Sequence, residues 1–324
     1  MARGWANERP LSSAGVDLGT SPAPTMDSSR SIGTAFLALG AVTWLLLVVG
    51  ATVRVHGAGL SCPDWPLCFG QLVPRLDFSI FLEWGHRLFA GTVSVGFLGL
   101  GIVVFRQAAL KERIGRWYLI SVGVLVLQIG LGGLTVLKLL AFWSVTSHLL
   151  TGNLFCFLLV NIGITLRQSP QPATPGCVGP MAVLLAALTF LQLALGGLVS
   201  SNMAGLACPT WPSCNGLWFP DWTGIVGLQV IHRLGAYTVL LAALGYAAMS
   251  FPHAQLRRRA FLIVGLVLAQ ITLGVLNVFW ALPVETAVLH SATADLLLLC
   301  TLVNARLVLG AVAAPVQAFR LAEG

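Results

Sequence analysis

The chain has 324 residues, of which 57% are hydrophobic and only 9% are charged, and its formal charge at pH 7 is +7. So few charges exclude a water-soluble globule and favour a bundle of helices embedded in lipid. The excess of positive charge does not indicate a nucleic-acid-binding protein, because the basic residues are scattered over short loops rather than gathered in one domain.

The first 31 residues, rich in Ser, Pro, Gly and Ala, predict a disordered cytoplasmic tail rather than a cleaved signal peptide. Eight apolar runs follow, each long enough to cross about 30 Å of hydrocarbon as a helix. They lack the alternation of a membrane β-barrel, so we expect an all-α membrane protein with eight transmembrane helices. The predicted spans are residues 32–53, 80–105, 117–137, 139–166, 181–201, 224–250, 260–281 and 286–309.

Basic residues mark the loops that face the cytoplasm. They are Lys111, Arg113 and Arg116 after the second span, Arg167 at the end of the fourth, and Arg257, Arg258 and Arg259 after the sixth. With eight spans, this distribution predicts that both termini are cytoplasmic and that the loops after the first and fifth spans are on the outer side.

The chain contains an internal duplication. Residues 50–70 and 196–216 are identical at 11 of 21 positions without a gap, at an offset of 146 residues. We therefore expect two pseudo-symmetric four-helix bundles: residues 32–167 and residues 181–309, joined by a cytoplasmic linker at 168–180 and followed by a C-terminal tail at 310–324. An even number of helices per repeat makes the repeats parallel, so equivalent residues lie at equal depth in the membrane.

Four histidines occupy equivalent positions of the two repeats. His86 matches His232 at the offset of 146, and His148 matches His290 at an offset of 142. A single intramembrane histidine is often only a partner in an interhelical hydrogen bond. Two per half at one depth predict instead that each half holds a flat apolar macrocycle between two imidazoles, as bis-histidine heme requires. A bare zinc or copper ion fits less well, because no carboxylate or thiol recurs beside all four.

Charged residues near these histidines are the other candidates for function. Arg87 and Arg233 each follow a histidine and could bind heme propionates, although snorkelling to head groups explains them equally well. Glu83 lies one turn before His86, whereas the second half has Gln229 there. This difference predicts chemistry in the N-terminal half and a permanent cofactor in the other; the alternative is an interfacial carboxylate near the head groups. The role of Asp295 stays open.

Both outer loops carry the pattern Cys-Pro-X-Trp-Pro-X-Cys. On the oxidising side of a membrane, we expect disulfides Cys62–Cys68 and Cys208–Cys214. A structural role is the simpler interpretation. The first pair is close in sequence to Glu83, so a redox role, in which the disulfide receives reducing equivalents, is the alternative.

Together, these residues resemble the heme A synthase family from about residue 32 to 309. The resemblance rests on the segment Glu83-Trp-Gly-His86-Arg87, on Ile231-His232-Arg233, on His148 and His290, on the repeated QxxLG segments and on the cysteine pairs. It implies that His232 and His290 bind heme b, that His86 and His148 bind the substrate heme O, and that Glu83 is the catalytic carboxylate. The family reaction oxidises a ring methyl of heme O in two hydroxylations, giving a gem-diol that loses water to leave the formyl group of heme A.

The resemblance also implies a setting for the protein. Many family members, notably mitochondrial ones, lack the loop cysteines, so this chain looks like a prokaryotic member from a bacterial or archaeal cytoplasmic membrane. Both hemes are expected toward the extracytoplasmic side. The expected partners are the lipid bilayer, a heme O synthase, and a membrane or extracytoplasmic electron acceptor.

Three other functions share some of these features. A diheme electron carrier of the cytochrome b type explains the histidines but not the difference between Glu83 and Gln229. A membrane thiol-disulfide oxidoreductase explains only the cysteines. A transporter is the weakest alternative, because paired helix breaks near the midplane do not stand out.

Overall fold

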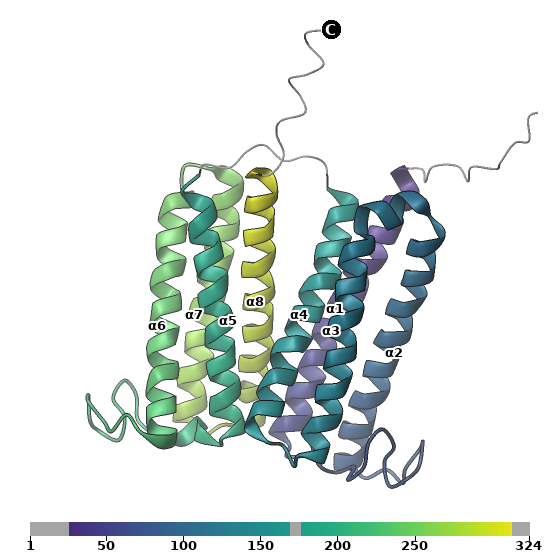
Figure 1. Ribbon diagram of the computed structural model, residues 1–324. Helices are drawn as coiled ribbons and strands as arrows, with labels where there is room; N and C mark the ends of the chain where they lie inside the picture. Colours follow the sequence, from purple (N-terminus) through teal and green to yellow (C-terminus); the bar gives the residue numbers. More distant parts are fainter. Residues whose placement is uncertain (1–25, 169–175, 313–324) are drawn as a thin grey trace, which may run out of the picture.

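The computed structural model describes residues 26–168 and 176–312, and in these ranges it contains long helices and no strand (Figure 1). The helices are α1 (Met26–Val55), α2 (Phe78–Arg106), α3 (Ala108–Leu137), α4 (Phe142–Arg167), α5 (Val178–Ser201), the 3₁₀ turn η1 (Ala204–Leu206), α6 (Gly224–Ser250), α7 (Ala254–Phe279) and α8 (Val284–Val312). Eight of them are long and apolar enough to cross a membrane. The prediction of an all-α membrane protein with eight spans is confirmed.

The helix boundaries differ from the predicted spans. The part of the predicted tail at 26–31 belongs to α1, α5 begins inside the predicted linker, and α8 extends beyond residue 309. The reason is that hydropathy marks the part of a helix inside hydrocarbon, whereas backbone hydrogen bonding continues into the polar interface. The rest of the predicted tails and linker, at 1–25, 169–175 and 313–324, lies outside the described residues.

The fourth span begins later than its apolar run. Leu139 and Leu140 have left-handed backbone angles, with φ of 51° and 58°, and the helix starts only at Phe142. The equivalent residues Ala281 and Leu282, with φ of 56° and 62°, form the turn before α8. A left-handed residue cannot continue a right-handed helix. An apolar sequence alone does not reveal this turn.

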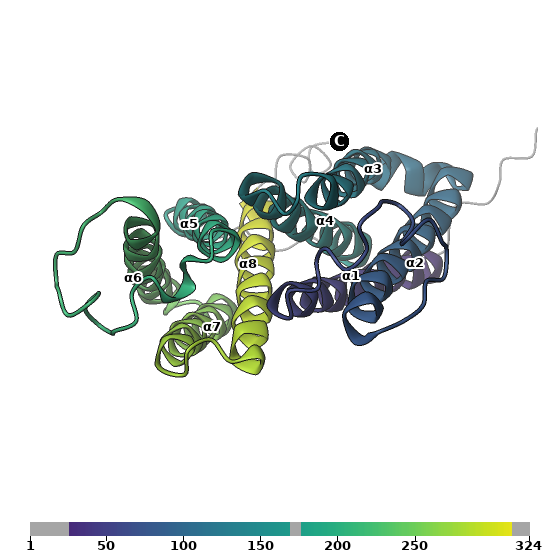
Figure 2. The same ribbon diagram turned by 90° about the horizontal axis from the view of Figure 1, so that it is seen from below.

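The helices of each half pack in a closed ring. In the first half α1 contacts α2 and α4, and α3 contacts α2 and α4; the contacts among α5, α6, α7 and α8 follow the same order. Seen along the helices, the two groups lie side by side (Figure 2). The interface between them is formed by α1 and α4 of the first half and by α5 and α8 of the second. Glycines allow the closest approach of α1 and α4, since a Cβ at Gly163 would lie 2.8 Å from the carbonyl oxygen of Gly33.

Equivalent residues of the duplication meet at the interface between the halves. Asn153 of α4 donates a buried hydrogen bond of 2.8 Å to Asp295 of α8, and these residues are separated by the repeat offset of 142. Arg54 of α1 donates to Ser200 of α5, which is its counterpart at the offset of 146. The predicted two-fold axis along the membrane normal would pass through such contacts. The sequence left the role of Asp295 open. In the structure, its hydrogen bond with Asn153 connects the two halves.

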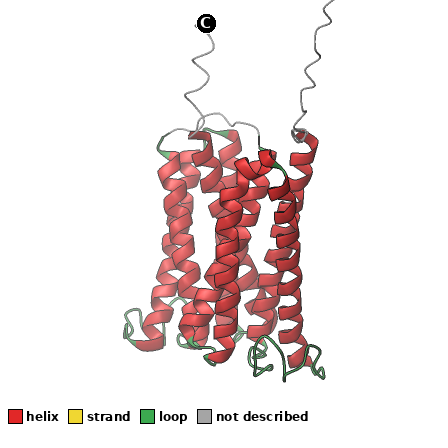
Figure 3. Ribbon diagram, turned by 45° about the vertical axis from the view of Figure 1, so that its right-hand side comes forward, coloured by secondary structure: helices red, strands yellow, loops and turns green. Residues whose placement is uncertain are grey.

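The start of α1 and the end of α8 lie at one end of the bundle, and both long loops lie at the other (Figures 1 and 3). The four histidines are in the second or third turn of helices that begin at the loop end. The candidate site therefore lies there.

Candidate functional site

Each of the four histidines is seated against a glycine of the preceding helix. A Cβ at the glycine would lie 3.0–3.2 Å from the imidazole Cε1 atom, closer than nine in ten real Cβ contacts. The pairs are His86 with Gly50, His148 with Gly132, His232 with Gly196, and His290 with Gly274. Glycine thus lets the ring lie against the backbone of the neighbouring helix, and the same seat occurs four times.

A glutamine one turn before the glycine reaches the imidazole in three of the four seats. The amide nitrogen of the glutamine lies 3.4 Å from His148 Nε2 for Gln128, 3.1 Å from His232 Nδ1 for Gln192, and 3.2 Å from His290 Nε2 for Gln270. The seat of His86 has Leu46 at the matching position. The Gln and the Gly of each QxxLG segment therefore contact the same imidazole ring and fix its position.

Within each half the two histidines are close enough to interact electrostatically, His86 with His148 and His232 with His290. Their assignment as heme ligands stays a prediction. Buried Nδ1 atoms of His86, His148 and His290 have no hydrogen-bond partner among the described residues. Leaving a buried polar group unpaired costs about 1–3 kcal/mol, so these atoms point to a ligand. Two neutral imidazoles in a half-buried apolar setting would suit the binding of a heme iron.

The two arginines hold the outer loops. Each guanidinium donates to three loop carbonyls, at 2.6–3.2 Å. The acceptors are Cys62, Asp64 and Leu67 for Arg87, and the equivalent Cys208, Thr210 and Ser213 for Arg233. The sequence suggested propionate binding or snorkelling to head groups for these arginines and did not predict their loop contacts, since nothing in a linear sequence marks a backbone carbonyl as an acceptor.

Glu83 is buried, with 4% of its surface exposed, and lies between the loop and the helix. One carboxylate oxygen is 2.5 Å from Arg87 Nη2, and the other accepts a hydrogen bond of 2.8 Å from the backbone N–H of Cys62. It forms the one ion pair in the described parts of the chain. The carboxylate is therefore turned toward the loop and Arg87 rather than toward the surface of the protein.

The counterpart Gln229 makes different contacts. Its amide nitrogen donates to the Gly205 carbonyl at 3.1 Å, and its buried amide oxygen has no partner within 26–168 and 176–312. The two halves thus share the arginine and its contacts with the loop carbonyls, and they differ in the charge of the residue one turn before the histidine.

Both predicted cysteine pairs are bonded, Cys62 to Cys68 and Cys208 to Cys214, and at most 4% of any of the four residues is exposed. The first loop also covers α3. The Trp65 ring packs on Gly133, where a Cβ would lie 3.1–3.3 Å from three ring atoms. Val275 occupies the equivalent place of α7, so this contact belongs to the first half alone.

The first loop has a carboxylate that the second lacks. Asp64 accepts hydrogen bonds from the backbone N–H groups of Phe69 and Gly70, at 2.6 and 2.8 Å, and these bonds lower the pKa of its carboxyl group. The second loop has Thr210 there, which accepts one bond from Gly216 at 3.3 Å.

We therefore expect acid to loosen only the first loop. A carboxyl whose pKa is lowered by folding stabilises the folded loop above its ordinary pKa of about 4, and that stabilisation is lost as the pH falls through the lowered value. Hydrogen exchange at Phe69 and Gly70 should accelerate there, relative to intrinsic exchange, whereas Gly216 should not change. Equal acceleration in both loops would show that Asp64 is not responsible.

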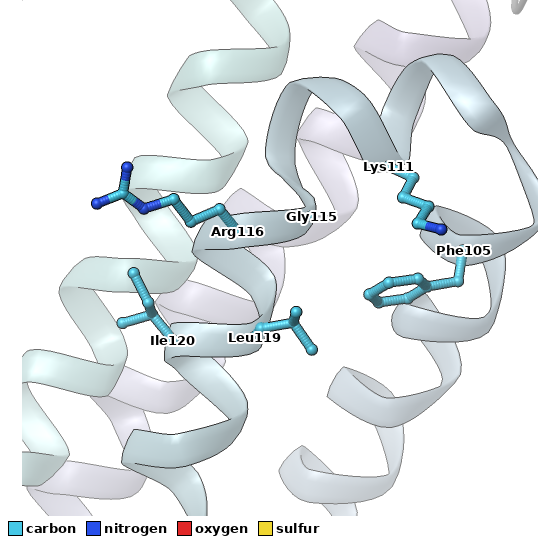
Figure 4. Close-up of a pocket in the computed structure, with 6 residues that line it drawn as sticks. All are labelled: Phe105, Lys111, Gly115, Arg116, Leu119 and Ile120. Carbon is cyan, nitrogen blue, oxygen red and sulfur yellow. The ribbon is translucent and has the colours of Figure 1, made fainter.

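A surface hollow of about 410 Å³ lies between α2 and α3 at the opposite end of the helices (Figure 4). Its lining residues are Phe105, Lys111, Gly115, Arg116, Leu119 and Ile120. None of them is a predicted site residue, so the hollow is separate from the histidine sites.

Comparison with known proteins agrees with this arrangement. The chain matches the family model described as cytochrome oxidase assembly protein over residues 34–80 and 75–302. It is 32% identical over 281 residues to the heme A synthase of Symbiobacterium thermophilum, covering 81% of this chain and 90% of that protein. It is 30% identical over 301 residues to the heme A synthase of Shewanella oneidensis, covering 79% and 90%. The chain therefore belongs to the heme A synthase family of cytochrome oxidase assembly proteins.

Proposed function

We propose that this protein is a heme A synthase, an oxidoreductase that converts a ring methyl of heme O to the formyl group of heme A. The observation that carries the proposal is the seat formed by a histidine and a glycine, which occurs twice in each half and leaves buried imidazole nitrogens without partners. The bacterial heme A synthases to which the chain is similar support the same activity.

In this proposal the two halves bind different hemes. His232 and His290 hold heme b, and His86 and His148 hold the substrate heme O. When bound, heme b would supply one-electron exchange. Arg87 and Arg233 would contact the propionates through their Nε–H groups, because in the described chain those groups donate no hydrogen bond whereas the terminal nitrogens are engaged by the loops.

Glu83 is the proposed catalytic carboxylate. Each hydroxylation replaces a C–H bond by a C–O bond to an oxygen from water and releases two electrons and two protons. Arg87 and the Cys62 N–H hold the Glu83 carboxyl group in place, one turn from His86. As a carboxylate, Glu83 can accept a proton from the incoming water or stabilise positive charge at the reacting carbon. The electrons pass to a membrane or extracytoplasmic acceptor.

The disulfides are assigned to structure in this proposal. Cys62 and Cys68 are 0% and 1% exposed, so a partner thiol has no access to either sulfur in this conformation. The burial of the pair disfavours a membrane thiol-disulfide oxidoreductase. The loops also face the extracytoplasmic side in the proposed topology, with both termini in the cytoplasm, which is where such bonds persist.

The test is to express the chain in a bacterial host that makes heme O, through a heme O synthase, but no heme A. Hemes are extracted from membranes and from the purified protein and separated by type. Heme A in the membranes, with heme b and heme O or heme A on the protein, is the expected result. Heme b alone at two per chain would favour the electron carrier, and protein without any heme would contradict both.

A further inference from the structure

The four histidine seats differ in one respect that the reaction itself does not explain. Three have a glutamine one turn before the glycine, and the seat of His86 has a leucine, Leu46. The direct counterpart of Leu46 at the offset of 146 is Gln192, which serves His232. The substitution therefore separates two otherwise equivalent sites.

Gln192 holds His232 at two points. Its amide nitrogen lies 3.1 Å from the imidazole Nδ1 and donates a hydrogen bond of 2.8 Å to the backbone carbonyl of the same residue. A histidine that binds a metal through one ring nitrogen carries a proton on the other and donates it to an acceptor, which fixes the ring and increases its basicity. The Gln192 Oε1 atom has no partner among the described residues, and a rotation of the amide group makes it the acceptor for the ring N–H. Losing such a partner typically lowers metal affinity by about 10- to 100-fold.

His86 has no such support. Neither ring nitrogen of His86 has a hydrogen-bond partner among the described residues, so when one binds iron the other has no support, and the ring is held by packing, including its contact with Gly50. Leu46 packs against the apolar cluster of the first half, which includes Phe36 and Phe97, and a leucine side chain has no group that could bond the imidazole.

The other ligand of the same half keeps its partner, since Gln128 contacts His148. Gln128 also accepts a hydrogen bond from the Thr151 hydroxyl, so the glutamine is itself held in place. The first half thus pairs one supported histidine with one unsupported histidine, whereas both histidines of the second half are supported by Gln192 and Gln270.

We propose that Leu46 makes His86 the displaceable ligand, so that heme exchanges at the first half and is retained at the second. This inference rests on the proposed function, because it requires heme in both halves. An enzyme whose substrate and product are both hemes needs one site that releases heme and one that does not. Leu46 and Gln192 are the positioning residues: Leu46 allows heme to leave the first half, and Gln192 keeps heme in the second.

Leu46→Gln tests the proposal. The purified protein carrying both hemes is mixed with excess apomyoglobin, and the heme that leaves is identified by extraction at successive times. Loss of heme O or heme A should slow by about 10-fold or more, whereas loss of heme b should not change. Leu46→Met, which has similar size but no amide, is the matched control and should exchange as the unmodified protein does.

The reciprocal variant Gln192→Leu tests the same proposal at the second half, and it can be used if Leu46→Gln does not fold. It should accelerate loss of heme b by about 10- to 100-fold and leave exchange at the first half unchanged. Unchanged rates in both variants, with both hemes present, would overturn this inference and leave the proposed function intact. Unmodified protein that carries no heme in its first half would instead contradict the proposed function.

Discussion

Glu83→Gln is expected to lower heme A formation by at least about 100-fold while heme O and heme b stay bound. General acid–base or electrostatic assistance by a positioned carboxylate commonly contributes this much. The neutral amide keeps the size of Glu83 but cannot accept a proton from water or stabilise a cation. The measurement is the ratio of heme A to heme O in membranes, together with the heme content of the purified variant.

The second half provides the control for this variant. Gln229 lies beside Arg233 without an ion pair, and Arg233 still holds its loop through three carbonyls. An amide at position 83 should therefore leave the first loop in place, and a thermal unfolding curve close to that of the unmodified protein would show it. Gln229→Glu should leave heme A formation unchanged. Normal output of heme A from Glu83→Gln would exclude the catalytic role.

His290→Ala should remove heme b and leave the substrate heme in place, and His148→Ala should do the reverse. The reason is that the two imidazole pairs belong to separate four-helix rings, so losing one axial ligand affects one iron. Heme types per chain are measured by extraction and chromatography, with optical spectra before and after reduction.

The two alanine variants serve as controls for each other, because they change equivalent residues at the start of α4 and α8. Both are expected to abolish heme A formation, so only the heme type that remains distinguishes them. Loss of both hemes from either variant, in protein that is still folded, would contradict the assignment of one heme to each half.

Some features needed no tertiary structure. Apolar runs of 20 or more residues depend on local composition, so the eight spans were predictable from a one-dimensional pattern. The duplication identified His86, His148, His232 and His290 as one set, because equal offsets imply equal depth. The cysteine pairs followed from short spacing within one loop. The positions of helix ends were less predictable, because Leu139 and Leu140 look apolar and yet form a turn.

Other features were decided only by the packing of helices. Glu83 reaches Cys62 across 21 residues, Asn153 reaches Asp295 across 142, and each histidine meets a glycine of another helix. The QxxLG segments were visible in the sequence, but that their Gln and Gly surround an imidazole was not. Hydropathy and repeats report which residues share a depth, whereas hydrogen bonds and ring seats depend on which helix faces meet. That choice is made by close packing of all eight helices together, and no single segment encodes it.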